Sequence, residues 1–148
     1  AAQTAQAVGR ALDRRPRIAR KLRERSFGIL EGKTLQELAE THPAEVKAYR
    51  GGDKDAIPAA EPYPAFIERT LRALRAIANR SESAVVVTHG GLLKVVLQAV
   101  HGSGKQFMVA NTALYAFEWD PDWRWGAGVA AGQPPRRILS SLESEEET

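Results

Sequence analysis

The sequence contains no cysteine, which excludes several classes of protein at once. Without thiols it can form neither disulfides nor thiolate metal sites, and a reducing compartment is compatible with this composition. The three histidines, His42, His89 and His101, lie far apart and do not have the HExxH spacing of a zinc site. We therefore expect neither a disulfide framework nor a metal centre.

Long apolar runs are also missing. No stretch approaches the length needed to span a bilayer, and the beginning lacks the charged and then apolar pattern of a secretory signal. We therefore expect a cytoplasmic protein without a membrane partner. The 148 residues, 43% of them hydrophobic, are enough for one core, and we place a single domain at residues 1–139.

Charge is unevenly distributed along the chain. The formal net charge is +3, arginines are concentrated in residues 10–25, and glutamates are concentrated in residues 143–147. No groove-reading motif or aromatic stacking platform accompanies the arginines, so we expect no nucleic-acid partner and keep a nucleic-acid binder as a minor alternative. The acidic tail, residues 140–148, lacks apolar anchors after Leu142 and is predicted to be disordered.

The most informative stretch is residues 84–93, AVVVTHGGLL. An apolar run too short for a helix ends in a histidine and two glycines, where a helical pattern begins, which predicts a strand, a tight turn and a helix. A continuous valine run favours a strand of a parallel sheet that is covered on both faces. Ligands bind beyond the carboxyl ends of such strands, so His89 lies where chemistry is usually done.

The two glycines after His89 predict an anion site. Backbone N–H groups at Gly90 and Gly91 would stand unpaired at a helix N-terminus, which suits a phosphate. The alternative is structural, because a histidine after a buried strand is often only a hydrogen-bonded core residue. Two glycines can equally mark a sharp turn.

Periodicity predicts alternating helices and strands, and hence an α/β protein. On the long helix at 66–78, Arg69, Arg72 and Arg75 are expected to point toward water. The expected helices lie at 4–12, 35–39, 44–49, 66–78 and 92–100, and the expected strands at 18–22, 84–88, 113–119 and 123–129.

Two segments together resemble the histidine phosphatase superfamily, the phosphoglycerate-mutase-like enzymes. They are LRERSFGILEGKT at 22–34 and THGG at 88–91, beside family patterns L-x-E-x-x-F-G-x-W-E-G-x-T and T-H-G-G. Between them, Glu61 stands where the family has the acidic residue of a G-E-S turn, and Arg69 follows at the usual helical distance. Residues 2–5, AQTA, look like the family's R-A-x-Q-T-A helix. Leu30 and the Pro after Glu61 depart from the family pattern, at the wall of the substrate pocket.

The resemblance implies a three-layer sandwich with a mostly parallel central sheet flanked by helices, and no cofactor. It assigns His89 the role of the second active-site histidine, which binds the phosphoryl oxygens, and Gly90 the role of a backbone donor to phosphate. It assigns Glu24 the role of the general acid that protonates the leaving alcohol and later deprotonates water. A surface ion pair with Arg23 or Arg25 is the alternative for Glu24.

The family's R-H-G tripeptide, whose histidine takes the phosphoryl group, is not in the sequence. We therefore expect an N-terminally truncated chain whose nucleophile lies upstream of Ala1, with little activity and marginal stability by itself. The implied function is hydrolysis of a small-molecule phosphate ester through a phosphohistidine. The short spacer from Gly32 to Glu61 favours a phosphatase over a mutase. An inactive relative that binds anions or serves as a scaffold, and a phosphoglycerate mutase, are the alternatives, and the substrate and oligomeric state stay open.

Overall fold

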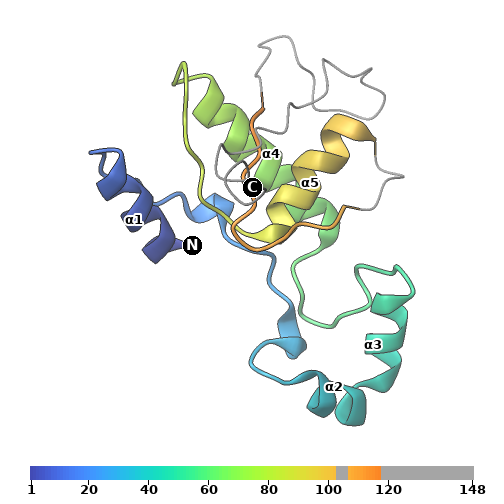
Figure 1. The fold of residues 1–148 in the computed structure, drawn as a ribbon. Helices are drawn as coiled ribbons and strands as arrows, with labels where there is room; N and C mark the ends of the chain where they lie inside the picture. The colour runs from blue at the N-terminus through green and yellow to red at the C-terminus, as the bar shows by residue number, and fades with distance from the viewer. Residues whose placement is uncertain (103–106, 118–148) are drawn as a thin grey trace, which may run out of the picture.

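The computed structural model describes residues 1–102 and 107–117 (Figure 1). The elements of this part are α1 (Ala2–Ala11), η1 (Arg20–Leu22), η2 (Gly28–Leu30), α2 (Leu35–Thr41), α3 (Pro43–Arg50), α4 (Tyr63–Ala78) and α5 (Gly90–His101), where η marks a short 3-10 helix. No helix in this part is both long and apolar enough to cross a membrane. The expected strand at 123–129 and the acidic tail at 140–148 lie outside the described residues.

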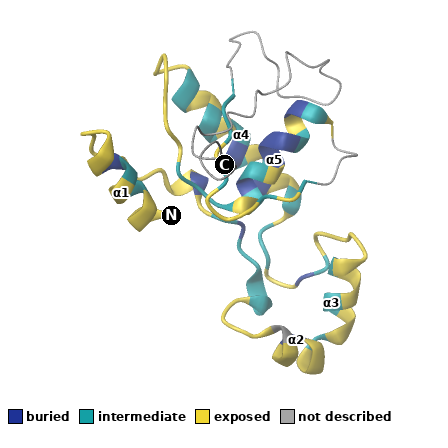
Figure 2. Cartoon of the chain, in the orientation of Figure 1, coloured by how far each residue is buried: buried dark blue, intermediate teal, exposed yellow. Residues whose placement is uncertain are grey.

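Helices α4 and α5 pack side by side and hold most of the buried apolar side chains (Figure 2). Apolar residues three and four apart give each helix one continuous apolar face. Phe66 of α4 is 2% exposed and contacts a cluster that includes Leu92 and Val95 of α5. Leu22 of η1 joins the same cluster, which fixes the start of the segment that leads to Glu24. The predicted helices at 66–78 and 92–100 are confirmed.

Helices α2 and α3 form a hairpin that lies apart from the α4–α5 pair (Figure 1). Helix α2 begins with a capping box, in which Thr34 accepts from the backbone N–H of Glu37 and the Glu37 carboxylate accepts from Thr34. Pro43 stands at the first position of α3, where its missing N–H costs nothing. The helices expected at 35–39 and 44–49 are confirmed, and α1 confirms the helix expected at 4–12.

The loop at 26–31 packs against residues 58–61, which precede α4. The N–H of Ile29 donates to the carbonyl of Pro58 at 3.2 Å, and the N–H of Glu61 donates to the carbonyl of Ser26 at 3.0 Å. Gly28 has a φ of +52°, and a side chain there would collide with the backbone of residues 58–60. Glycine is therefore required for the approach of the two segments.

The described residues contain no β-strand, which differs from the prediction. The valine run is not covered on both faces, since Val85 is 64% exposed, and residues 18–22 hold the exposed Ile18 and η1 instead of a strand. Residues 113–117 also show no strand, and 118–119 lie outside the described part. A strand exists only when its backbone groups bond to a neighbouring strand, and no described segment pairs with 84–88.

Candidate active site

The carboxylate of Glu24 lies against the first turn of α5. Its Oε2 accepts a hydrogen bond from the N–H of Gly91 at 3.1 Å, and its Oε1 accepts from the N–H of Arg25 at 2.9 Å. A side chain on residue 91 would meet this carboxylate, so the second glycine of T-H-G-G permits the contact. The structure therefore brings together two parts of the expected site that are far apart in the sequence.

His89 is held between two contacts to the segment that carries Glu24. The hydroxyl of Thr88 donates to the carbonyl of Leu22 at 2.9 Å, and Gly91 donates to Glu24 as described. His89 itself is extended, with φ −121° and ψ 160°, and occupies the N-cap position of α5. Its side chain is partly buried. The chain thus presents a histidine and a carboxylate at one helix N-terminus.

Gly90 faces open space at the same N-terminus. No atom lies within 4 Å of the position that a Cβ would take there. The first turn of α5 contains no acidic residue of its own, and the side chain of the N-cap residue His89 makes no capping hydrogen bond, so Glu24 supplies the carboxylate that binds this turn. The Gly91 N–H is taken by Glu24, and the N–H of Gly90 and the positive end of the helix dipole are suited to an anion. Among the described residues, no cluster of three acidic or histidine side chains could hold a metal ion.

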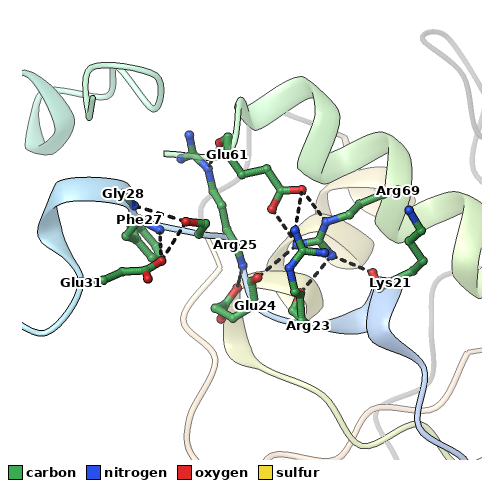
Figure 3. Close-up of polar contacts among 10 residues, drawn as sticks. Lys21, Arg23, Glu24, Arg25, Phe27, Gly28, Glu31, Glu61 and Arg69 are labelled. Atoms are coloured by element: carbon green, nitrogen blue, oxygen red, sulfur yellow. Dashed lines mark hydrogen bonds and ion pairs between the residues drawn. The ribbon is translucent and has the colours of Figure 1, made fainter. Parts of the chain in front are cut away.

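Arg69 lies beside the backbone of Glu24, and it does not point toward water as predicted (Figure 3). Its side chain is 11% exposed and binds the Glu61 carboxylate through Nε at 2.5 Å and Nη2 at 2.7 Å. Arg69 is mostly buried because position 69 is three residues after Phe66 and borders the buried face of α4. Arg72 and Arg75 are exposed as predicted.

The electrostatic state of Glu61 follows from this pairing. The hydrogen bonds from Arg69 lower the pKa of the Glu61 carboxyl below its ordinary value of 4.5. Arg23 adds a weaker attraction, with its Nη2 3.9 Å from Glu61 Oε1. Glu61 therefore stays ionised and holds the Arg69 guanidinium through two hydrogen bonds, which are drawn in Figure 3.

The contacts of Arg25 test the alternative that Glu24 only forms a surface ion pair with a neighbouring arginine. The Arg25 side chain is 3% exposed and pairs with Asp55 at 3.0 Å, while its Nε donates to the carbonyl of Glu61 at 2.6 Å. Its guanidinium also lies over the ring of Tyr63, 5.4 Å from the centroid. Since Arg25 pairs with Asp55 and Arg23 lies 3.9 Å from Glu61, the alternative pairing of either arginine with the Glu24 side chain is not observed in the described residues.

Sequence reasoning did not identify the contacts of Arg25 and Arg69. Both arginines lie in an arginine-rich background, where most side chains are solvated. The sequence neighbours of each arginine could have indicated these contacts. Arg69 follows Phe66 at helical spacing, and Arg25 stands next to Glu24 in the motif. His42 and His101 lie elsewhere, at the α2–α3 junction and at the end of α5.

Residues 1–126 match the histidine phosphatase superfamily (branch 1). The chain is 29% identical over 111 residues to phosphoglycerate mutase-like protein 4 of Arabidopsis thaliana, covering 72% of this chain and 48% of that protein. It is 35% identical over 97 residues to metal-independent phosphoserine phosphatase of Arabidopsis thaliana, covering 63% of this chain and 41% of that protein.

The chain thus spans about half the length of these relatives, or somewhat less. No solved structure matches it significantly. Since the family match extends over most of the chain and includes both motifs of the site, the chain belongs to branch 1 of the histidine phosphatase superfamily.

Proposed function

We propose that this chain forms part of a phosphomonoesterase that hydrolyses a small-molecule phosphate ester through a phosphohistidine. The contact between the Glu24 carboxylate and the first turn of α5, directly after His89, is the observation that carries this proposal. The phosphoryl-accepting histidine lies upstream of Ala1, on the first strand of a three-layer sandwich with a mostly parallel sheet. Family membership supports the α/β class, and the missing R-H-G tripeptide supports the upstream position.

In the first step the upstream histidine nitrogen attacks phosphorus, and the bond to the ester oxygen breaks. Glu24 donates its proton to that oxygen, so the alcohol leaves neutral. His89 and the N–H of Gly90 hold the phosphoryl oxygens and stabilise the charge that grows on them, with the positive end of α5 behind them. The chain's own groups supply this stabilisation.

In the second step water attacks phosphorus and the bond to the histidine nitrogen breaks. The Glu24 carboxylate takes the proton from water, and inorganic phosphate is released. The hydrogen bonds to Glu24 from Arg25 and Gly91 hold the carboxylate in one place for both transfers. One residue can therefore serve as acid and then as base.

The test is hydrolysis of an aryl phosphate by the full-length protein. We expect His89→Ala to lower kcat on the order of 10²- to 10³-fold, the range for loss of one transition-state donor. His42→Ala, in the α2–α3 hairpin, is the matched control and should keep the parent rate. An unchanged rate in His89→Ala would remove His89 from the mechanism.

Two other functions are separated by simple observations. A phosphoglycerate mutase would transfer phosphate between positions of a phosphoglycerate instead of releasing it, and the short spacer between Gly32 and Glu61 speaks for the phosphatase. An inactive anion-binding relative is favoured by the missing R-H-G alone. Reading the DNA upstream of the codon for Ala1 decides, because an in-frame R-H-G segment there indicates an enzyme.

A further inference from the structure

Every N–H donor of the Arg69 guanidinium has an acceptor. A guanidinium carries five N–H groups in a planar fork. Two of them bind the Glu61 carboxylate, at 2.5 and 2.7 Å. The other three donate to backbone carbonyls of the segment that ends at Glu24, namely Lys21 at 2.6 Å, Arg23 at 3.0 Å and Glu24 itself at 3.1 Å. The Arg69 side chain is 11% exposed, so its N–H groups bind protein acceptors and have little contact with water.

The three carbonyl acceptors lie between η1, which contains Lys21, and Glu24, where the chain leaves the 3-10 helix. After η1 ends at Leu22, the backbone runs extended through Arg23, with φ −68° and ψ 158°. The carbonyls of residues 21, 23 and 24 turn toward one guanidinium (Figure 3). The far end of Glu24 is held by Gly91 and Arg25. Glu24 is thus fixed at its backbone by α4 and at its carboxylate by α5.

We propose that Arg69, clamped by Glu61, is a positioning residue that sets the backbone of residues 21–24 so that the Glu24 carboxylate reaches Gly91 beside His89. The catalytic consequence rests on the phosphatase proposed above, whereas the placement of Glu24 does not. A displacement of a reacting group by about 1 Å can cost on the order of 10²-fold in rate, so the position of this backbone matters.

The chemistry of arginine suits this task better than that of lysine. A lysine ammonium has three donors on a flexible stem and cannot serve two carboxylate oxygens and three carbonyls together. Glu61 contributes a bidentate partner that fixes the plane of the guanidinium and offsets its charge. Arg69→Lys therefore keeps the charge and loses the geometry.

The placement of Glu24 is tested by NMR on the full-length protein. Glu24→Gln should move the amide resonances of Gly91 and Arg25, which donate to its carboxylate. We expect this response to fall at least twofold at Gly91 when Arg69→Lys is already present. Arg72→Lys, on the exposed side of the same helix, is the matched control and should leave the response unchanged. A full response at Gly91 in Arg69→Lys would overturn the proposal.

The catalytic consequence is tested by comparing two leaving groups. An alkyl phosphate needs the proton from Glu24, whereas p-nitrophenyl phosphate releases a stable anion and needs it less. We expect Arg69→Lys to lower kcat about tenfold for the alkyl ester, to change kcat much less for the aryl ester, and to leave KM near the parent value. Glu24→Gln should show the same selectivity more strongly.

An equal fall for both esters would show a merely structural role and contradict the proposal. If Arg69→Lys does not fold, Glu61→Gln takes its place, because it releases the guanidinium while keeping the shape of the side chain. If the parent hydrolyses no phosphate ester, the proposed function fails, and the Gly91 resonance still decides whether Arg69 positions Glu24.

Discussion

Two glycines of the site are required for different reasons. Gly28 has a positive φ of +52° and lies against the backbone of residues 58–60. Gly91 is part of α5 and leaves room for the carboxylate of Glu24. A backbone neighbour cannot move aside, whereas the end of a glutamate side chain can. Alanine at position 28 should therefore lower the stability of the protein, whereas alanine at position 91 should move the Glu24 carboxylate.

Gly28→Ala is expected to destabilise the protein by about 2 kcal/mol or more, because the left-handed conformation alone costs about 1–2 kcal/mol and the backbone collision adds to it. The measurement is the free energy of unfolding of the full-length protein in urea. Gly32→Ala is the matched control, since Gly32 has a φ of +74° but no neighbour within 4 Å. Equal losses at both positions would mean that the packing against residues 58–60 is unimportant.

Gly91→Ala is expected to displace the Glu24 carboxylate with little loss of stability. Gly91 lies in the first turn of α5 without a positive φ, and alanine in place of glycine there stabilises by about 0.4–1 kcal/mol by restricting the unfolded chain, which offsets the collision. The readouts are the amide resonance of Arg25, which should move, and the thermal midpoint, which should stay near that of the parent. Gly90→Ala has open space and should leave the Arg25 resonance in place. A moved resonance in Gly90→Ala alone would contradict this reasoning.

At the scale of elements, Asp55 joins the loop after α3 to the start of α4. Its Oδ1 accepts from Arg25 Nη2 at 3.0 Å and from the N–H of Tyr63 at 2.6 Å. The carboxylate therefore serves a buried arginine and the first N–H of a helix at once. Burial also raises the pKa of Tyr63, and its hydroxyl donates to Gln98 of α5.

Asp55→Ala should cost about 1–2 kcal/mol of unfolding free energy. Removing one partner of a buried pair can cost about 3–5 kcal/mol, and the 52% exposure of the Asp55 side chain reduces this through solvent screening. Glu68→Ala breaks the exposed pair with Arg72 and should cost only about 0.3–0.5 kcal/mol. Urea titration of both variants gives the comparison, and a smaller loss in Asp55→Ala than in Glu68→Ala would contradict it.

The helices could be predicted because their signals are local. Phe66, Thr70 and the apolar residues after them follow helical spacing, and Pro43 and the Thr34 capping box mark helix starts within a few residues. The strand at 84–88 could not be predicted in the same way. Its valines favour a strand, but a strand forms only when a second strand pairs with it, and the local sequence does not specify that partner. Family membership implies an α/β fold, while the described residues contain helices alone.

In the candidate site, too, the sequence predicted residues that belong to local motifs but not the contacts between distant segments. The T-H-G-G and F-G motifs led to His89 and Glu24 by resemblance, and the contact through Gly91 is a tertiary fact that no spacing specifies. Arg69 was assigned to the solvated face by its charge. Its burial depends on the carbonyls of residues 21–24, which reach it from a distant segment.

At the scale of the whole molecule, the Glu61–Arg69 pair predicts acid sensitivity. The pKa of Glu61 is lower in the folded state, so in acid the unfolded state binds more protons. Its contribution to stability is complete above the ordinary pKa of 4.5 and is lost as the pH falls through the folded value. We expect the urea midpoint of the full-length protein to fall over this range, and less steeply in Glu61→Gln. Glu82→Gln, at an exposed glutamate that forms no ion pair within the described residues, is the comparison, and equal slopes in the parent and Glu61→Gln would contradict the assignment.

The described residues also leave an apolar groove of about 980 Å³ between α4, α5 and residues 113–117. Val85, Val86 and Leu114 line it and are 64%, 36% and 61% exposed. An apolar surface of this kind binds hydrophobic dyes and promotes self-association. The backbone groups of residues 84–88, which have no backbone partner within the described residues, also favour self-association.

We therefore expect the 148-residue chain by itself to bind anilinonaphthalene sulfonate, to sediment as more than one species and to unfold without a sharp transition. Val85→Lys places a charge in the groove and should weaken dye binding. Leu12→Lys, on the residue that follows α1, should not, because Leu12 is exposed but lies outside the groove. A stable monomer that unfolds cooperatively and binds no dye would show that the groove is covered in solution, and the marginal stability inferred for this chain would then be wrong.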